Sequence, residues 1–278
     1  MKMFENKVVL ITGGNRNAGL WLVKKFVDEG ARVFTCARNE NSAADGIKSL
    51  GEMGIEVTLG PTTAGVRMIV CDISKLDEVT AMFDVIEREV GRLDILVNNA
   101  ANQGLGHGGP LEMDPAKFNE VFSVNVFGGF QVTQQASKRF FLSEKQVKGK
   151  GEGRDKGVVV FLSSNTAMRA IRNRTAYCTS KGAINSMVRA LALDLAPLGI
   201  RVNCCAPGYI NTSRWDTLDP EIAKRRRANC PLGREASGED IANVVAFLAS
   251  DMSANMTGEI VTCDAGCSCQ HMPGDVDR

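Results

Sequence analysis

An apolar run, a glycine-rich turn and a helical pattern follow one another near the start of the chain, and this order restricts the fold strongly. Val8–Ile11 is apolar, as in a parallel strand buried on both faces. The turn Thr12–Gly19 leads into a helical pattern that ends at Gly30. Such a turn lets main-chain N–H groups and the helix N-terminus approach a pyrophosphate. The unit therefore predicts a dinucleotide site beside a parallel sheet.

Apolar runs and helical patterns keep alternating along the 278 residues. This alternation predicts one α/β domain, a Rossmann-type doubly wound parallel sheet with helices on both faces. Gly54–Arg67 contains Gly60-Pro61 and is predicted to be a loop. Further strands are predicted at Val33–Cys36, Met68–Cys71, Leu93–Val97 and Val158–Leu162, and helices at Ala43–Met53, Lys75–Val90, Pro115–Arg139 and Thr175–Leu195.

Composition excludes several classes of function. The formal net charge of +1 argues against a chain-wide nucleic-acid role. No apolar run approaches the ~20 residues of a membrane span, and the N-terminus shows no signal peptide pattern. Nine cysteines without a pairing pattern suit a reducing compartment. We therefore expect a cytoplasmic protein without nucleic-acid or membrane partners. The cluster Cys263, Cys267, Cys269 and His271 lacks paired C-x-x-C spacing, so we expect no metal.

Ser164, Tyr177 and Lys181 form the main candidate for catalysis. Tyr177 and Lys181 are four residues apart on a predicted helix, so they share one face. A free tyrosine has a pKa near ~10, and an ammonium nearby favours the phenolate. A tuned tyrosine exchanges a proton with an alcohol or carbonyl oxygen, which a serine hydroxyl can also bind. The pattern predicts proton transfer at an alcohol or ketone, with a hydride partner.

The end of the second predicted strand bears on the choice of nucleotide. An acidic residue there binds a ribose 2′-hydroxyl and favours NAD, whereas an arginine accommodates the 2′-phosphate of NADP. This strand ends Cys36-Ala37-Arg38 without an acid, and Arg16 in the glycine turn is a second cation. We therefore predict NADP(H), with NAD(H) as the alternative.

The chain resembles the main, single-domain branch of the short-chain dehydrogenase/reductase family. One motif alone would be weak evidence, but here all of them occur in the family's order. The resemblance runs from Lys7 to about Gly266 and rests on Thr12–Gly19, Asp72, Asn98-Asn99-Ala100, Asn125, Ser164, Tyr177-x-x-x-Lys181, Pro207-Gly208 with Thr212, and Asp264-Ala265-Gly266.

This resemblance implies the roles of individual residues. Tyr177 is expected to be the general acid/base, with Lys181 lowering its pKa and holding the nicotinamide ribose. Ser164 is expected to orient the substrate oxygen, and Asn125, on a kinked helix, to hold a water in a relay to Lys181. The expected cofactor-binding residues are Gly13, Asn15, Arg16, Asn17, Ala18, Arg38, Asp72, Ile73, Asn99, Tyr177, Lys181, Ile210 and Thr212.

The chain departs from the family pattern at Ala101, which replaces a usual glycine, in the longer segment Gly54–Arg67, and in the two features that follow. Asn17 stands where the family usually has glycine. Asparagine tolerates a positive φ better than other non-glycine residues, so we expect the turn to survive. Ser143–Lys156 is longer than expected and rich in lysine, and is interpreted as a solvated loop, with a partner site as the alternative.

The family resemblance also implies a lid, at about residues 209–234 within a domain spanning 1–266, followed by a tail at 267–278. A helix is predicted at Pro220–Asn229 on the lid, carrying the basic run Lys224–Arg227. With Arg169, Arg172 and Arg174 these cations either attract an anionic substrate tail, or are solvated or make subunit contacts. Six apolar side chains are expected either to line the substrate pocket or to pack in the core: Met168, Ile171, Tyr209, Ile210, Trp215 and Leu218. Of these, Trp215 is the favoured substrate contact.

Three functions follow from these features. The first is an NADP(H)-dependent dehydrogenase of a hydroxysteroid or bile acid, and the second is a 3-oxoacyl thioester reductase. The third, of another class, is a non-catalytic nucleotide-binding regulator, which would not need Asn125, Ser164, Tyr177 and Lys181 together. By family analogy we also expect a homo-oligomer, either a dimer or a tetramer.

Overall fold

One parallel sheet forms the centre of the molecule. The computed structural model describes residues 2–62, 65–106, 108–143, 155–212, 215 and 218–271. In this part of the chain, 8 strands pair in the order β3-β4-β2-β1-β5-β6-β7-β8, and every pair is parallel. The predicted doubly wound fold is therefore confirmed. The strands are β1 Val8–Thr12, β2 Arg32–Ala37, β3 Val57–Thr58, β4 Val66–Val70, β5 Ile95–Asn98, β6 Gly157–Leu162, β7 Ile200–Pro207 and β8 Ile260–Cys263.

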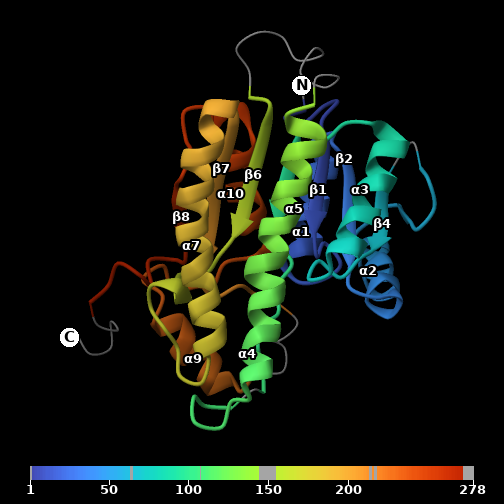
Figure 1. Cartoon of the computed structure of the whole chain (residues 1–278). Helices are drawn as coiled ribbons and strands as arrows, with labels where there is room; N and C mark the ends of the chain where they lie inside the picture. Colours follow the sequence, from blue (N-terminus) through green and yellow to red (C-terminus); the bar gives the residue numbers. More distant parts are fainter. Residues whose placement is uncertain are drawn as a thin grey trace.

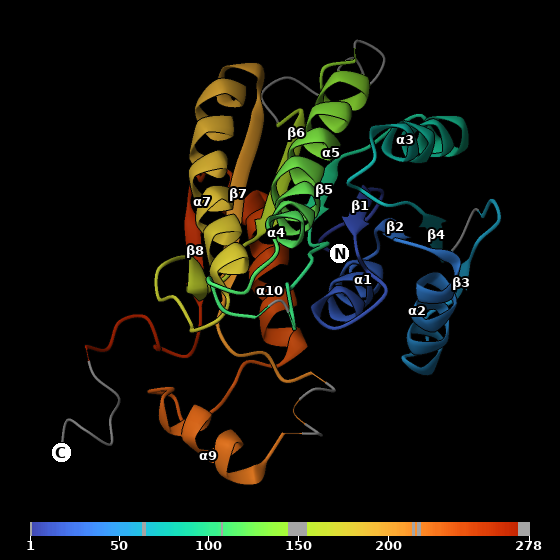
Figure 2. The same ribbon diagram turned by 60° about the horizontal axis from the view of Figure 1, so that its bottom comes forward.

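Helices cover both faces of this sheet (Figure 1). The first group, α1, α2 and α10, packs on one face, and the second, α3, α5 and α7, on the other. Figure 2 shows α9 apart from both groups, on the side of the carboxyl ends of the strands. The helices are α1 Ala18–Asp28, α2 Glu40–Glu52, α3 Leu76–Val90, α4 Pro115–Phe122, η1 Ser123–Gly128, α5 Gly129–Ala136, η2 Ser137–Phe141, η3 Asn165–Ala167, α7 Thr175–Leu195, η4 Ala196–Leu198, α9 Pro220–Ala228, α10 Gly238–Ala249 and η5 Asp251–Ser253.

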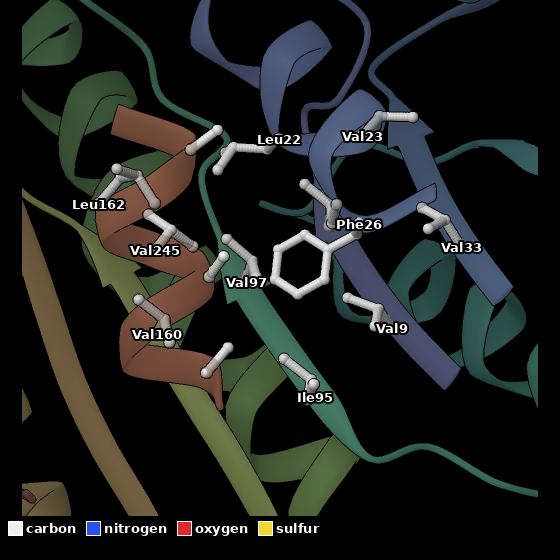
Figure 3. Close-up of a cluster of buried hydrophobic side chains, with 14 of the residues drawn as sticks. Val9, Leu22, Val23, Phe26, Val33, Ile95, Val97, Val160, Leu162 and Val245 are labelled. Atoms are coloured by element: carbon white, nitrogen blue, oxygen red, sulfur yellow. The ribbon is translucent and has the colours of Figure 1, made fainter. Parts of the chain in front are cut away.

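Side-chain alternation along the strands divides the core in two. Val9 and Ile11 of β1 belong to the cluster that includes α1 and α10, whereas Val8 and Leu10 belong to the cluster under α3 and α5. Figure 3 shows the ring of Phe26, from α1, at the centre of the first cluster among valine, leucine and isoleucine side chains. Because both faces are covered, the strands are mostly apolar, as the sequence indicated. Arg201 and Asn203 of β7 are exceptions, and both are buried.

The sequence interpretation was wrong for part of Gly54–Arg67. Val57 and Thr58 form the short edge strand β3, with Val57 opposite Val66, and β4 begins at Val66. A strand of 2 residues is too short to show alternation. Helix α2 also starts earlier than predicted, because Asn39 caps it reciprocally with Ser42.

The predicted helix Pro115–Arg139 is confirmed and continues to Phe141. Asp114 caps it, and Pro115 stands at its first position. Its turns widen to π-helix at η1 and η2, which helical periodicity did not indicate. Residues 144–154 of the predicted Ser143–Lys156 loop and residues 272–278 of the tail lie outside the described residues. Among those described, no helix is long and apolar enough to cross a membrane.

Gly238 lets α10 pack closely on α1, and this contact gives a test of the packing. A Cβ atom there would lie 1.9 Å from Cδ1 of Trp21. We expect Gly238→Ala to lower the free energy of unfolding by about 1–3 kcal/mol, because the indole must move. Gly51, in α2, has nothing within 4 Å of such an atom. The control Gly51→Ala should leave stability unchanged or raise it by up to ~1 kcal/mol. Urea unfolding measures both, and equal effects would contradict the packing argument.

Candidate active site

The loops after β1 and β5 meet where the strand order reverses, the usual ligand position in an open α/β sheet. The buried Thr12 hydroxyl accepts hydrogen bonds from the main-chain N–H groups of Asn99 and Ala100, both at 3.1 Å. The Asn99 amide donates to the carbonyls of Thr12 and Gly13 at 2.9 and 2.8 Å. Asn99, predicted to bind the cofactor, thus also fixes the shape of the glycine turn.

The glycine turn has a positive φ at Asn17, the position where the family usually has glycine. Asn17 has φ 51° and ψ −132°, so the expected positive φ is present. Its ψ lies outside the left-handed helical region, in a conformation that glycine prefers and that costs about 1–3 kcal/mol for other residues. Asn17 does not cap α1, and no acidic side chain lies in the first turn. Ala18 therefore begins a helix whose positive end is open to an anion, as a pyrophosphate requires.

Arg16 and Arg38 lie on loops that are joined to each other. The Asn15 amide donates to the Ser42 carbonyl at 3.0 Å and so ties the glycine turn to the start of α2. Arg38 lies between the end of β2 and that helix. Both arginines are exposed, and neither forms an ion pair or side-chain hydrogen bond within the described ranges. The guanidinium groups of Arg16, in the turn, and Arg38, beside it, are therefore available to a ligand.

Ser164, Tyr177 and Lys181 are brought together by β6 and α7. Ser164 follows the end of β6, and its hydroxyl accepts a hydrogen bond from the Thr166 N–H at 3.2 Å. Lys181 Nζ lies 5.6 Å from the ring centre of Tyr177. The same Nζ donates to the Leu162 carbonyl at 2.7 Å. The ammonium thus lies between the strand end and the phenol, one helical turn from Tyr177 as predicted.

Burial changes the acid–base behaviour of Lys181. The side chain is 3% exposed, and desolvation lowers the pKa of its ammonium from 10.5 to about 8, although the nearby Cys204 acts weakly in the opposite direction. No carboxylate pairs with it within the described ranges. The group is therefore still mostly charged at neutral pH, but only by a small margin.

Asn125 ties three parts of the site together from η1. Its Oδ1 accepts the Asn102 N–H at 2.7 Å, and its Nδ2 donates to the Asn102 carbonyl at 2.9 Å and to Ser180 Oγ at 3.0 Å. Ser180 in turn donates to the Tyr177 carbonyl at 2.8 Å. Both amide hydrogens of Asn125 are used, so its side chain can accept a hydrogen bond from a relay water but cannot donate one to it. Sequence reasoning missed Asn102 and Ser180, which carry no motif of their own.

The remaining predicted cofactor residues flank this centre. Asp72 accepts hydrogen bonds from the N–H and hydroxyl of Ser74. Ile73 is buried, and Gly128 of η1 packs closely on its side chain. Ile210 pairs with Ala236 through an isolated bridge at the start of the predicted lid. The Thr212 carbonyl accepts the Trp215 N–H at 2.8 Å.

Several lid residues serve the lid's own packing. Trp215 donates from Nε1 to the Ile210 carbonyl at 2.8 Å and meets Tyr209 edge to face. Arg226 lies over both rings, at 5.5 and 5.8 Å. Arg227 forms a two-point ion pair with Glu235, whose carboxyl pKa it lowers. The basic run is therefore only partly available to a ligand, and the substrate contact of Trp215 stays a prediction.

The start of the tail docks on the end of the lid helix. Cys267 and Cys230 are free thiols with 3.3 Å between their sulfur atoms. Gln270 donates to the Asn229 carbonyl at 2.6 Å, and the Arg169 guanidinium donates to the Cys267 carbonyl. This contact was not predicted, because its partners are far apart in sequence. Within the described ranges, no group of three or more His, Cys, Asp or Glu side chains is arranged to hold a metal ion.

Comparisons with known proteins agree with this geometry. A family model described as Enoyl-(Acyl carrier protein) reductase matches residues 15–268. The chain is 32% identical over 263 residues to a 3alpha-hydroxysteroid dehydrogenase of Mediterraneibacter gnavus, covering 94% of this chain and 97% of that protein. It is 31% identical over 271 residues to dehydrogenase/reductase SDR family member 4 of Caenorhabditis elegans, covering 95% and 96%. The chain belongs to the short-chain dehydrogenase/reductase family.

The solved structures support the same assignment. The crystal structure of gox2181 superposes with a TM-score of 0.81 at 31% identity, covering 96% of this chain and 97% of that one. The protein is thus an oxidoreductase of the short-chain dehydrogenase/reductase family that acts on CH–OH groups and uses NAD(P)(H).

The lowered pKa of Lys181 predicts how stability depends on pH. Between about pH 8 and 10.5 the unfolded lysine holds a proton that the folded one has lost. Stability therefore rises with pH in this window, by up to about 3 kcal/mol for this group. Lys181→Met removes this titrating group. As the pH rises from about 8 to 10.5, the unfolding free energy of the wild type should therefore increase relative to that of the variant. Urea unfolding at several pH values measures this difference; a constant difference would contradict the lowered pKa.

Proposed function

We propose that the protein interconverts a secondary alcohol and a ketone with NADP(H), on a bulky apolar substrate that carries an anionic tail, of the hydroxysteroid or bile acid type. The grouping of Tyr177, Lys181 and Ser164 at the carboxyl end of β6 carries the chemical part of this proposal. Two further sets of exposed side chains support the nucleotide and the substrate class.

Proton transfer is assigned to the residues around the phenol. Tyr177 accepts the alcohol proton during oxidation and returns it to the carbonyl oxygen during reduction. Ser164 donates a hydrogen bond to that oxygen. Lys181 favours the phenolate by its charge, and it has N–H groups besides the one bonded to Leu162 that fit ribose hydroxyls. Asn125 holds α7 and the Asn102 loop in position. The nicotinamide, when bound, supplies or accepts the hydride.

The nucleotide is proposed to be NADP(H) because of two arginines, one in the glycine turn and one between β2 and α2. Arg16 and Arg38 are exposed and uncommitted within the described ranges, and β2 ends at Ala37 without a carboxylate. Guanidinium groups bind phosphate in a planar, two-point geometry. The open N-terminus of α1 fits the pyrophosphate.

The substrate class follows from side chains on the loop before α7 and on the lid. Met168 and Ile171, between Ser164 and Tyr177, are 54% and 46% exposed. Ile222 on α9 is 47% exposed. Arg172 on the same loop and Arg225 on α9 are exposed as well. Apolar surface edged with cations suits a rigid apolar body with a carboxylate.

Two other functions compete with this one. A 3-oxoacyl thioester reductase uses the same catalytic residues and cofactor, and the description of the matching family model names an acyl carrier protein. A non-catalytic nucleotide-binding regulator would need the glycine turn but not the buried ammonium beside Tyr177.

We also propose that the protein is a homo-oligomer, a dimer or tetramer. Phe127 and Phe130 are 62% and 41% exposed on η1 and α5, and Leu193 on α7 is 78% exposed. These apolar groups on two helices of one face suit contact with a second copy.

A matched assay of nicotinamide absorbance tests the function. NADP(H) and NAD(H) are offered separately with hydroxysteroids, bile acids and 3-oxoacyl thioesters. We expect turnover with NADP(H) on a hydroxysteroid or bile acid, and Tyr177→Phe should reduce it by at least ~10³-fold while the fold survives. Turnover confined to thioesters would favour the reductase alternative. Cofactor binding without turnover on any substrate would favour the regulator, and an active Tyr177→Phe would refute the mechanism.

The choice of nucleotide has its own test in Arg38. Arg38→Leu should raise the KM for NADP⁺ by about 10–100-fold, because a charge-assisted hydrogen bond to phosphate contributes about 1.5–3 kcal/mol. The KM for NAD⁺ should stay within about twofold, since that nucleotide lacks the phosphate. Equal changes for the two nucleotides would show that Arg38 does not contact the 2′-phosphate.

A further inference from the structure

A second cation lies against the ring of Tyr177. The guanidinium carbon of Arg174 is 4.9 Å from the ring centre, closer than the 5.6 Å of Lys181 Nζ. The Arg174 guanidinium also donates to the carbonyl of Gln103, on the loop after β5. The arginine is therefore held over the aromatic ring rather than extended into solvent.

The position of Arg174 is unfavourable for α7 itself. It is the residue that precedes the first helical residue, and its side chain makes no capping hydrogen bond. Ser, Thr, Asp or Asn is preferred at this position, and a positive charge opposes the helix dipole there. Local stability does not explain an arginine here, whereas contact with the phenol does.

We propose that Arg174 is a positioning residue that holds its charge against the ring of Tyr177 and favours the ionised form of the phenol. The inference rests on the proposed role of Tyr177 as acid/base. A cation within about 6 Å of an aromatic face is attracted to it, and more strongly once the ring bears a negative charge. The phenol thus has two cations against it, Arg174 at the start of α7 and Lys181 one turn into the helix from Tyr177.

Other charged and titratable groups near this centre come from the elements packed around α7. The Cys204 thiol of β7 lies near Lys181, and burial raises the pKa of that thiol to about 12, so it stays neutral. On the loop after β5, the Glu112 carboxylate lies beside Gly109 next to Asn173. On α4, Lys117 pairs with Glu120 at 2.7 Å. Glu112 is exposed, so solvent screens its charge.

The phenol can be titrated directly, because the chain has only 2 tyrosines. Absorbance near 295 nm follows phenolate formation, and Tyr177→Phe leaves the titration of Tyr209 alone, so subtraction assigns the signal of Tyr177. We expect Arg174→Gln to move the Tyr177 midpoint upward by about 0.5–1 pH unit, which is about 3–10-fold in the dissociation constant. Glutamine retains an N–H for the Gln103 carbonyl, so the loop keeps its anchor.

Two matched variants separate charge from structure in this titration. Arg174→Lys keeps the charge and should retain most of the wild-type midpoint. Arg172→Gln removes an exposed charge two residues away and should move the midpoint by no more than ~0.2 unit, because solvent screens exposed charges. An unmoved midpoint in Arg174→Gln, or an equal shift in Arg172→Gln, would overturn the inference.

The pH profile supplies the kinetic readout. With NADP⁺ and the best secondary alcohol of the panel, kcat/KM rises with pH as the phenol ionises. Arg174→Gln should displace this rise upward by the same amount and approach wild-type activity above it, whereas a structural defect lowers activity at every pH. An inactive Tyr177→Phe with an unshifted Arg174→Gln profile would refute only this inference. An active Tyr177→Phe would refute the proposed function, while the titration still reports on Arg174.

Discussion

The buried ammonium of Lys181 is the constraint on which the catalytic half of the structure depends. A charged group taken out of water is costly, and here a hydrogen bond to the carbonyl at the end of β6 compensates for part of that cost. That bond fixes the position of α7 relative to the end of β6. Ser163 adds a second link, because its hydroxyl donates to the Lys181 carbonyl at 3.1 Å. The same geometry places Tyr177 one turn away. The buried ammonium of Lys181, the end of β6 and the phenol of Tyr177 are thus held in one arrangement.

Asparagine side chains hold the loops around this arrangement. Asn98 donates to Thr133 at 2.9 Å, Asn99 closes the glycine turn, and Asn125 joins η1 to the loop at Asn102. Each amide satisfies main-chain or hydroxyl groups that would otherwise be buried without partners. The three contacts made by these asparagines are neutral hydrogen bonds. Such bonds preorganise a site without adding charges that compete with Lys181.

The sequence predicted the elements whose apolar pattern is long enough to be unambiguous. β1, β6 and α7 fall where expected, since buried strands and a 21-residue helix carry strong local signals. The 2-residue β3 and the wide turn η1 carry no such signal.

At the site, sequence order placed Tyr177 and Lys181 on one helix face, because their spacing is a local property. The sequence pattern overestimated how much of the lid's positive charge is available to a ligand, because the ion pair between Arg227 and Glu235 becomes visible only in the folded structure. The sequence indicated Arg174 only as a cation near the pocket. Its contact with Tyr177 follows a left-handed backbone residue, Asn173 with φ 58°, which the sequence pattern did not indicate.

Three places where local rules are broken coincide with the proposed chemistry. Asn17 adopts a backbone conformation suited to glycine, Arg174 opposes the dipole of α7, and Lys181 is charged and buried. Much of the rest of the chain follows these rules, with strands covered on both faces and α2 capped reciprocally. A fold that only had to be stable would gain nothing from these three exceptions. Their concentration around one glycine turn and one phenol is what a nucleotide-dependent proton-transfer site requires.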